Sequence, residues 1–389
     1  AIEAFAAAEA GGTPRVDGDQ ASLDDSCARA AQIIARSRLP LFAGLATDVA
    51  GAKAVMDLAE RAGGVVDHAE SDAMFRNFFV LMDKGWMTTT LAEVKNRVDL
   101  LIVAGTDVVS RLPRFFERYV WNADSLFAPE PAAREVVYLG EALDTEAGRA
   151  PDGRAPTVIA CDGSRLAEVF GAMRALYHGR PLQAAEAGGV RIERLRDLVA
   201  RMKRAKYGVI AWVAADLAES NGELAVEAIS DLVTDLNETG RFSCLPLGGA
   251  DDAFGAAQVC SWQSGFPLRV SFASGHPEYD PHLLSWRRLV ADGAVDSLTW
   301  VSAFRADDLP VDAGVPTIVV GAPGIDFRRE PEVYIPVGIP GLDHDGHVVR
   351  TDTVASLPLR RLRDVDLPRT ADVIRAIGAH LIQQQQVEG

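Results

Sequence analysis

Two short stretches of the chain concentrate side chains that bind metal ions or transfer protons. The first is Asp343-His344-Asp345-Gly346-His347, which holds two imidazoles and two carboxylates. Both groups are common ligands of zinc and other divalent metals. Asp345-Gly346 is also a turn dipeptide, between a strand expected near Val333 and the apolar Val348-Val349. We therefore favour a hairpin tip for this stretch, with a metal site as the alternative.

The second stretch is His276-Pro-Glu-Tyr-Asp-Pro-His282. Its imidazoles and carboxylates could also ligate a metal. However, its two prolines and the aspartate before Pro281 are typical of a rigid loop that leads into a helix. The favoured interpretation is that the histidines face solvent or form local hydrogen bonds.

No pattern in the chain indicates an activated nucleophile. The G-x-S-x-G elbow is absent, so no serine has an assigned base. The cysteines lie far apart, without a C-x-x-C pair, which argues against a disulfide framework or a cluster signature. They are Cys27, Cys161, Cys244 and Cys260. Because Cys161 and Cys244 stand in apolar runs, we expect them to be core residues rather than reactive thiolates.

An absence is equally informative. Between His68 and Cys161 the chain contains neither cysteine nor histidine. No thiolate or imidazole from that stretch can therefore serve a metal or a proton transfer.

Composition limits the classes of function. The chain has 389 residues, 48% hydrophobic, and a formal net charge of -16. That length predicts more than one α/β core, and the acidic balance argues against nucleic-acid binding. Residues 1–12 do not have the pattern of a secretory signal, and the apolar run at 207–215 is too short to cross a bilayer. We expect a cytoplasmic protein with no membrane partner.

Short apolar runs alternate with amphipathic segments, as in parallel α/β sheets. We expect strands at 39–43, 65–66, 99–104, 157–161, 207–213, 242–246, 297–302, 316–320 and 333–336. Helices are expected at 50–62, 165–177, 222–236 capped by Asn221, 281–291 and 370–385.

The loop composition of residues 178–190 suggests a lobe boundary. The expected organisation is a leader segment at 1–20, a first Rossmann-like lobe at 21–180, a second at 181–330, and a C-terminal strand, hairpin and helix at 331–389. Nucleotide fingerprints are absent. Doubly wound sheets bind ligands beyond the carboxyl ends of their strands, so the loops after Ala43, Ala104, Val213 and Pro246 are the candidate binding loops.

A set of longer motifs resembles the pterin-binding B subunit of formylmethanofuran dehydrogenase, and the resemblance covers most of the chain beyond about residue 22. These motifs are Asp67-His68, Gly85-Trp86, Thr90-Leu91 with Glu93-Val-Lys-Asn-Arg97, Asp235-Leu-Asn237, Leu245-Pro-Leu-Gly-Gly249, Gly255-Ala-Ala-Gln258, Trp262-Gln-Ser-Gly-Phe-Pro267, Phe272-Ala-Ser-Gly-His-Pro-Glu-Tyr-Asp-Pro281 and Val333-Tyr-Ile-Pro-Val-Gly-Ile-Pro340.

The resemblance implies the formate dehydrogenase type of fold found in molybdopterin oxidoreductases. Two Rossmann-like lobes there hold a molybdenum or tungsten bis-pterin. A cysteine or selenocysteine thiolate binds the metal, a histidine follows it, and an arginine of the second lobe faces the substrate.

Aligned on these motifs, the Cys-His pair falls at Ala73-Met74, followed by Phe75 and Arg76, and the arginine falls at Gly248. Ala73 and Met74 cannot replace a thiolate and an ionisable imidazole, and Gly248 offers no charge to a substrate. The family's iron-sulfur segment has no counterpart either. We therefore expect no catalytic residue, no metal and no cofactor in this chain.

The chain looks most like a redox-inactive branch of this family, the B subunits of formyltransferase/hydrolase complexes of methylotrophic bacteria. The resemblance implies a non-catalytic structural subunit in one-carbon metabolism, from formaldehyde to formate. Its implied partners are a formyltransferase, an amidohydrolase-like hydrolase and companion subunits. The alternatives are an active molybdenum or tungsten formylmethanofuran dehydrogenase subunit and a carrier-binding module that uses the emptied cleft.

Overall fold

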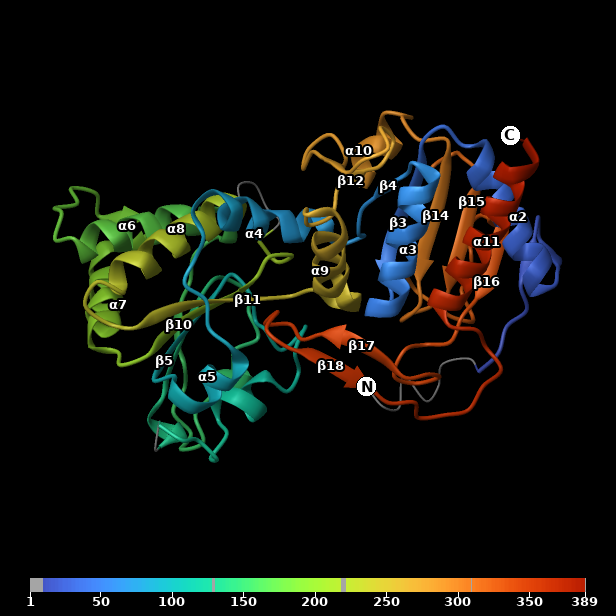
Figure 1. Ribbon diagram of the computed structural model, residues 1–389. Coiled ribbons are helices and arrows are strands. Elements are labelled where there is room, and N and C mark those ends of the chain that lie inside the picture. The colour runs from blue at the N-terminus through green and yellow to red at the C-terminus, as the bar shows by residue number, and fades with distance from the viewer. Residues whose placement is uncertain (1–9, 128–129, 218–221, 309, 389) are drawn as a thin grey trace. The chain divides into compact units, whose positions relative to one another are not determined.

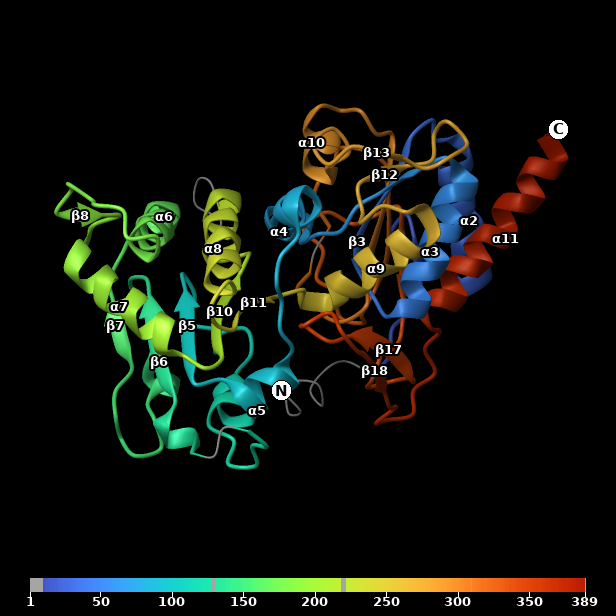
Figure 2. The ribbon, with the colours of Figure 1, turned by 60° about the vertical axis from the view of Figure 1, so that its left-hand side comes forward.

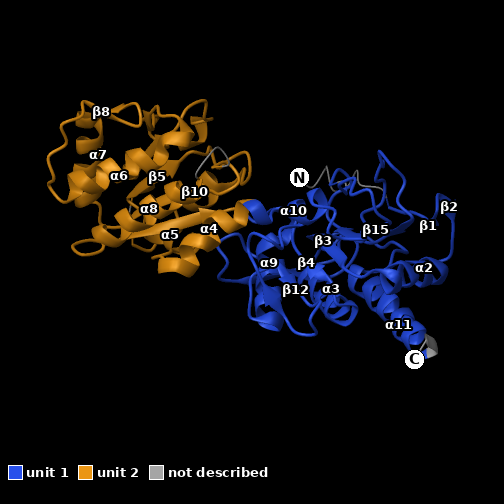
Figure 3. Cartoon of the chain, turned by 90° about the horizontal axis from the view of Figure 1, so that it is seen from above, with its two compact units in different colours: residues 1–72, 249–389 blue, residues 73–248 orange. Residues whose placement is uncertain are grey.

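A computed structural model describes residues 10–127, 130–217, 222–308 and 310–388 of the chain. The contacts divide it into two compact units (Figure 3): unit 1 combines residues 1–72 with 249–389, and unit 2 holds residues 73–248. Each unit is an α/β layer structure built on its own sheet (Figure 1). The expected fold class, two Rossmann-like lobes with mainly parallel sheets, is confirmed.

Unit 1 contains a nine-stranded sheet in the order β13-β12-β4-β3-β14-β15-β16-β1-β2. Its strands are β1 (Arg15–Val16), β2 (Asp19–Gln20), β3 (Pro40–Ala46), β4 (Val65–Val66), β12 (Val270–Ser271), β13 (Glu278–Tyr279), β14 (Ser297–Ser302), β15 (Thr317–Gly321) and β16 (Val333–Pro336). The five central strands from β4 to β16 pair in parallel, and the outer strands pair antiparallel. All seven residues of β3 are buried, as expected for a parallel strand covered on both faces.

Helices and a hairpin complete unit 1. They are α2 (Leu23–Arg36), α3 (Val49–Ala62), α9 (Ala253–Ser264), α10 (Trp286–Ala291), α11 (Thr370–Glu388) and the hairpin β17 (Gly346–Val349) with β18 (Ser356–Leu359). Helices α2, α3 and α11 pack on one face of the sheet (Figure 2). On the other face, Trp286 of α10 meets Trp300 of β14 edge to face, with ring centroids 5.7 Å apart.

Unit 2 contains a five-stranded, all-parallel sheet in the order β11-β10-β5-β6-β7. Its strands are β5 (Leu100–Ala104), β6 (Glu135–Leu139), β7 (Thr157–Ile159), β10 (Gly208–Val213) and β11 (Phe242–Leu247). Its helices are α4 (Ser71–Lys84), which begins in unit 1, α5 (Leu91–Arg97), α6 (Leu166–Tyr177), α7 (Ile192–Arg204) and α8 (Gly222–Leu236), with a small hairpin of β8 (Glu186–Ala187) and β9 (Val190–Arg191).

Strand β10 shows how the unit 2 sheet is covered. Ile210 and Trp212 join the core under α6, α7 and α8, whereas the alternate residues Val209, Ala211 and Val213 join the core under α5. Because successive side chains of a strand point to opposite faces of the sheet, alternate residues of this one apolar run enter two separate cores.

The division of the chain differs from the expected lobes. The expected boundary near residue 180 lies inside unit 2, because β10 pairs with β5, with Gly208 opposite Leu100. Residues 15–20 of the expected leader form β1 and β2, and residues 1–9 lie outside the described residues. Segment 331–389 contributes β16, the β17–β18 hairpin and α11 to unit 1.

Most of the expected elements are present with shifted ends. Helix α8 spans 222–236 as expected, and its expected cap, Asn221, lies outside the described residues. Helix α10 is shorter than the expected 281–291, because the Asp280 carboxylate accepts the backbone N–H groups of His282 and Leu283 in a turn. Among the described residues, no helix is both long and apolar enough to span a bilayer.

Candidate functional site

The first candidate positions lie near the start of α4. Ala73 is partly exposed, and Met74 and Phe75 are buried at 3% and 1% exposure. An alkyl and a thioether side chain thus stand where the sequence alignment placed the thiolate and the imidazole. Neither side chain can ionise, so these two positions offer neither a thiolate ligand nor a proton carrier.

The next residues of α4 are engaged in the interior of unit 2. The Arg76 guanidinium donates to the Ala214 carbonyl at 2.9 Å, and the Asn77 side-chain oxygen accepts the Trp212 indole N–H at 3.0 Å. Phe75 meets Phe78 edge to face, with ring centroids 5.5 Å apart. Phe75 and Arg76, which follow the vacated positions, therefore serve the packing of the helix on its own unit.

The third candidate position, Gly248, follows β11 and has φ +148°. L-amino acids rarely adopt that conformation, and glycine adopts it without steric cost. The next residue, Gly249, also has a positive φ, of +73°. The backbone conformation at this position therefore favours glycine. An arginine here, as the resemblance to formylmethanofuran dehydrogenase implies, would strain it.

We expect Gly248→Arg to lower the free energy of unfolding by about 1–3 kcal/mol because of this backbone conformation. Gly163→Arg is the matched control: Gly163 has no positive φ, and among the described residues nothing lies within 4 Å of a Cβ at either glycine. Urea unfolding measures both variants. Equal losses in the two would contradict a conformational cause.

A buried ionic network in unit 1 precedes the vacated positions. The Asp67 carboxylate accepts the Ser71 hydroxyl at 2.9 Å and the backbone N–H groups of His68 and Trp286 at 2.9 and 2.8 Å. Arg269 lies 3.6 Å from the same carboxylate and also contacts Ser71 and Asp72. Burial raises the pKa of Asp67 to about 6, against the opposing effect of Arg269 and the three donors. These contacts join the segment that leads into α4 to Arg269 and to the first residue of α10.

His68 is fully buried beside this network. Its Nδ1 accepts the Glu70 backbone N–H at 3.0 Å, which places the ring proton on Nε2. Burial lowers the pKa of His68 to about 4, with a smaller opposing effect from the Asp251 backbone. The imidazole is therefore neutral at pH 7, and its position within the interior does not suit acid-base exchange with a solvent-borne substrate.

A second buried carboxylate follows at the start of α9. Asp252 has φ +59° and is 7% exposed, and its Oδ1 accepts the Val349 backbone N–H of β17 at 2.7 Å. Burial raises the pKa of Asp252 to about 7, and the nearby Asp48 carboxylate raises it further. Asp48 itself caps α3 by accepting the Gly51 N–H at 3.0 Å. Both carboxylates therefore hold backbone elements together at the carboxyl end of β3.

Two of the expected binding loops meet within unit 2. Thr106, after β5, and Asp216, after β10, form a hydrogen bond of 2.5 Å between Oγ1 and Oδ2. These strands are neighbours at the point where the strand order reverses, the usual ligand position in a doubly wound sheet. Arg111 also pairs with Asp216 at 3.3 Å, so the polar groups there bind one another. In unit 1, β3 extends past Ala43 to Ala46, which moves its loop to Thr47-Asp48.

The expected hairpin tip at 343–347 is wrong in its placement. Gly346 begins β17, which pairs with β18, so the hairpin turn lies between Val349 and Ser356. Asp343 binds Arg363 at 2.5 Å and accepts the Ile339 N–H, and both ring nitrogens of His344 contact backbone carbonyls. The Asp343 and His344 side chains are buried, because the chain here folds back against the residues that follow β16.

The loop at 276–282 has the expected local role. His276 contacts the Ser274 hydroxyl at 2.9 Å, and the Asp280 side chain shapes the turn that precedes α10. Across the part of the chain that the structure describes, no group of three or more His, Cys, Asp or Glu side chains could hold a metal ion.

All four cysteines are in the core, each at 1% exposure or less. Burial raises the pKa of Cys27, Cys161 and Cys260 to about 11 and also raises the pKa of Cys244. The expectation that Cys161 and Cys244 are core residues agrees with this burial, although β7 ends two residues before Cys161.

We expect the native protein to react with a thiol reagent such as iodoacetamide at least about a hundredfold more slowly than the urea-unfolded chain, because reaction requires an exposed thiolate. A Ser274→Cys variant is the control, since Ser274 is exposed. Mass spectrometry should find label on that added cysteine alone. Rapid native labelling of Cys244 would contradict this core assignment.

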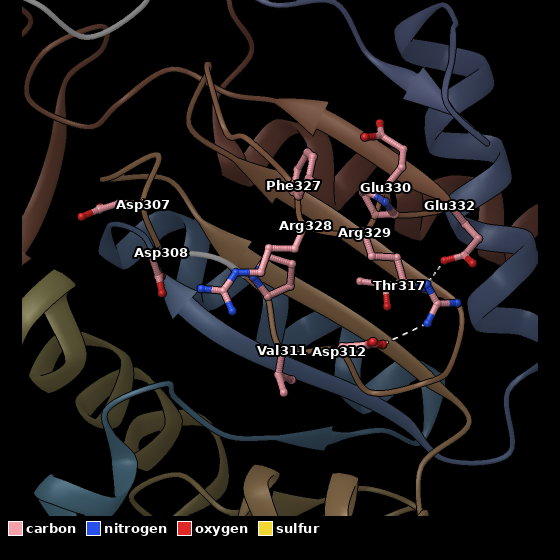
Figure 4. Close-up of a pocket in the computed structure, with 12 residues that line it drawn as sticks. Asp307, Asp308, Val311, Asp312, Thr317, Phe327, Arg328, Arg329, Glu330 and Glu332 are labelled. Atoms are coloured by element: carbon pink, nitrogen blue, oxygen red, sulfur yellow. Dashed lines mark hydrogen bonds and ion pairs between the residues drawn. The ribbon is translucent and has the colours of Figure 1, made fainter.

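A cavity of about 720 Å³ in unit 1 was not foreseen from the sequence (Figure 4). Residues 307–308, 310–312 and 327–332 border it, and none of the candidate positions lines it. Its charged groups mostly bind protein partners: Asp312 pairs with Arg329 at 2.9 Å, Glu330 pairs with Arg15 at 2.6 Å, and Glu332 accepts the Thr317 N–H. These four charged side chains are therefore engaged with protein groups.

Comparisons with known proteins agree with this fold. No protein-family model matches the chain. The chain is 29% identical to the B subunit of the formyltransferase/hydrolase complex (Fhc) of Methylorubrum extorquens, over 84% of this chain and 85% of that protein. It is 25% identical to the B subunit of the tungsten-containing formylmethanofuran dehydrogenase 2 of Methanocaldococcus jannaschii, over 87% of this chain and 78% of that protein.

Two solved structures are also similar. A chain of the formyltransferase/hydrolase complex (FhcABCD) of Methylorubrum extorquens, crystallised with methylofuran, matches with a TM-score of 0.81 at 27% identity, over 96% of this chain and 99% of that one. Acetylene hydratase of Pelobacter acetylenicus matches with a TM-score of 0.59 at 11% identity, over 97% of this chain and 61% of that one, a likeness of fold alone. In sequence and in fold, the chain is thus a relative of the B subunits of formyltransferase/hydrolase complexes and of formylmethanofuran dehydrogenases, with the molybdopterin oxidoreductase type of fold.

Proposed function

We propose that the chain is a non-catalytic structural subunit of a formyltransferase/hydrolase complex in one-carbon metabolism. The observation that carries the proposal is the chemistry of Ala73, Met74 and Gly248, the positions to which the resemblance assigns the metal-binding pair and the substrate-facing arginine. The similarity to the B subunit of the Methylorubrum extorquens complex, and the match to a chain of the FhcABCD structure, support the choice of complex.

A metal bis-pterin does not fit the residues present. The resemblance implies a metal-binding thiolate followed by an imidazole, and Ala73 and the buried thioether of Met74 supply neither. The glycine conformation at Gly248 also disfavours a substrate-facing arginine. The chain therefore carries out no redox step, and the formyl chemistry belongs to its partners: a formyltransferase, an amidohydrolase-like hydrolase and companion subunits.

Native purification tests the proposal. A tagged chain expressed in its source organism should copurify with the partner subunits in a fixed ratio. Elemental analysis of the same preparation should find no stoichiometric tungsten or molybdenum, and the preparation should not reduce a viologen dye with a formylated carrier. A stable monomer without partners would contradict the structural role, whereas stoichiometric tungsten or molybdenum would favour an active dehydrogenase.

Substitution at the vacated positions separates structure from chemistry. Met74→Leu preserves the buried apolar volume, so we expect the purified complex to transfer and hydrolyse formyl groups at the wild-type rate. A strong fall in turnover with intact assembly would give Met74 a role in the reaction and would contradict the proposal.

A further inference from the structure

The carboxyl end of β3 is the position in unit 1 where a ligand is expected. The chain runs from β3 to β4 on one side of β3, whereas β14, β15 and β16 follow on its other side. Ligands of doubly wound sheets usually bind where the strand order reverses in this way. Helix α3 follows β3, and the free N–H groups and partial positive charge of a helix N-terminus bind phosphate groups. This edge of the sheet is therefore suited to an anion.

Asp48 places a carboxylate at this helix end. It is the N-cap residue of α3, is 4% exposed and accepts the Gly51 backbone N–H at 3.0 Å. The Thr47 hydroxyl lies against the same turn, since a Cβ added to Gly51 would be 2.2 Å from Thr47 Oγ1. Thr47 is fully buried, and among the described residues nothing forms a hydrogen bond with its hydroxyl. The first turn of α3 thus offers an unused hydroxyl and already holds an anion that belongs to the chain.

Asp252 brings a second carboxylate to the same place from α9, which packs beside α3 (Figure 2). A Cβ added to Gly255 would be 2.1 Å from Asp252 Oδ2, so this carboxylate lies over the first turn of α9. Asp48 is among the groups that raise the pKa of Asp252, and the Gly255 N–H opposes that rise. The two carboxylates therefore interact with each other, and each one lies at a helix N-terminus.

Neither carboxylate has a cation for a partner. Among the residues that the structure describes, no lysine, arginine or histidine forms an ion pair with Asp48 or Asp252. Arg305 binds the adjacent Asp251 instead. Buried carboxylates need compensating charge or hydrogen bonds, and here the N-termini of α3 and α9 and backbone N–H groups of α3 and β17 supply them. The helix ends and the carboxylates therefore satisfy each other.

Two buried carboxylates are also possible ligands of a metal ion. A cation between them would face the positive ends of two helices, which repel it. The described residues also contain no group of three or more His, Cys, Asp or Glu side chains that could hold a metal ion. An anion that the chain itself supplies to the helix ends is therefore the better account of this geometry.

We propose that the Asp48 and Asp252 carboxylates are built-in anions, which fill the anion position at the carboxyl edge of the unit 1 sheet and exclude phosphate-bearing ligands from it. This inference rests on the proposed function, because it names the residues that keep a phosphate-bearing cofactor out of unit 1. Exclusion has two causes: the carboxylates repel a second anion, and their atoms occupy the space beside the N–H groups. Removing both carboxylates should convert this edge into a phosphate site.

A pair of glycine substitutions tests the proposal. Asp48→Gly with Asp252→Gly removes both charges and both carboxyl groups, and glycine is tolerated at an N-cap and at the φ of +59° of Asp252. Asp19→Gly with Asp326→Gly is the matched control, because it makes the same charge change at two exposed residues of unit 1. Asp48→Asn with Asp252→Asn removes the charges and keeps the volume. This asparagine pair decides the test if circular dichroism shows the glycine pair to be unfolded.

Urea unfolding of the full chains is measured at pH 8, above the Asp252 pKa of about 7, in sodium phosphate and in sodium chloride of equal ionic strength. We expect about 20 mM phosphate to lower the unfolding equilibrium constant of the glycine pair at least about tenfold more than that of the control pair. A dissociation constant of about 2 mM gives this factor, because binding lowers the constant by one plus the ratio of phosphate concentration to dissociation constant. The asparagine pair should gain about two- to threefold, and wild type should respond like the control.

Hydrogen exchange locates the bound ion. Phosphate should slow the exchange of amides in the first turns of α3 and α9 in the glycine pair, and not in wild type. Protection confined to other segments would mean an adventitious ion only and would overturn the proposal. Equal responses of both Asp48 and Asp252 pairs and the control would also overturn it, as would wild type that binds phosphate at this edge as tightly as the glycine pair.

These outcomes are separate from the test of the proposed function. Any of them, with native wild type that assembles with its partners and lacks tungsten and molybdenum, would overturn this inference alone. Stoichiometric tungsten or molybdenum in native wild type would overturn the proposed function and this inference with it.

Discussion

Replacing Arg269 with methionine should destabilise the protein by about 3–5 kcal/mol, because a buried carboxylate would lose its cation. The Arg269 side chain is 5% exposed and the Asp67 side chain is fully buried. Methionine preserves much of the side-chain volume, so the loss would come from charge rather than from a cavity. Unfolding in urea, followed by circular dichroism, measures the effect.

Three further variants define the cause. Arg38→Met removes an arginine that is 93% exposed and should change stability by less than about 0.5 kcal/mol. Asp67→Asn combined with Arg269→Met should cost less than the sum of the single changes, because no unpaired charge remains buried. Arg269→Lys should recover part of the loss. A cost below about 1 kcal/mol for Arg269→Met would mean that the network is not important for stability.

Replacing Asp252 with asparagine should stabilise the protein above pH 7 by up to about 4 kcal/mol. The pKa of this carboxyl group is raised from 3.8 to about 7, chiefly by burial and then by the Asp48 carboxylate. An asparagine side-chain oxygen can still accept the Val349 N–H, and asparagine tolerates the left-handed φ of +59° at this position.

The sign follows from proton binding. Between pH 3.8 and about 7, the folded protein holds a proton on Asp252 that the unfolded chain has released. Stability of the wild type therefore falls as pH rises through this window and reaches its lower level above about pH 7. Asparagine stays neutral throughout, so the difference between variant and wild type should grow across the same window.

His68 contributes a trend of the opposite sign. Its pKa is lowered to about 4, so the folded protein binds fewer protons than the unfolded chain between pH 4 and 6.5. The comparison of Asp252→Asn with wild type removes this shared contribution. Asp124→Asn, at a side chain that is 93% exposed, is the matched control and should give no pH-dependent difference. A constant difference from pH 4 to pH 8 for Asp252→Asn would contradict the shifted carboxyl group.

Much of the secondary structure was predictable from local pattern. Strands β14 and β16 and helix α8 have the expected bounds, because each is a compact apolar or amphipathic run with clear ends. Helix α7 was not predicted, although its buried residues at 192, 195, 198, 199 and 202 have helical spacing. Helix α9 gave a weaker signal because most of its residues are buried, with no polar face to define a period.

The candidate site was predictable only as positions and not as contacts. Motif spacing located Ala73, Met74 and Gly248, and the structure adds that Met74 is buried and that Gly248 has a glycine-specific φ. The ionic network of Asp67 and Arg269 was not foreseen, since about two hundred residues separate its members. The expected placement of the Asp343 and His344 side chains was also wrong, because the pairing of β17 with β18 decides it.

The sequence by itself determined which chemistry is absent. No folding of the chain can supply a cysteine or histidine from residues 69–160, because side-chain chemistry is a property of composition. It also determined the alternation of strands and helices, because the spacing of apolar residues within each segment indicates whether that segment is a strand or a helix. Only the tertiary structure decided that β3 pairs with β14 and β5 with β10, and hence how the chain divides into units. Which strands pair depends on packing between segments that are far apart in the chain. Local sequence patterns therefore do not predict the pairing.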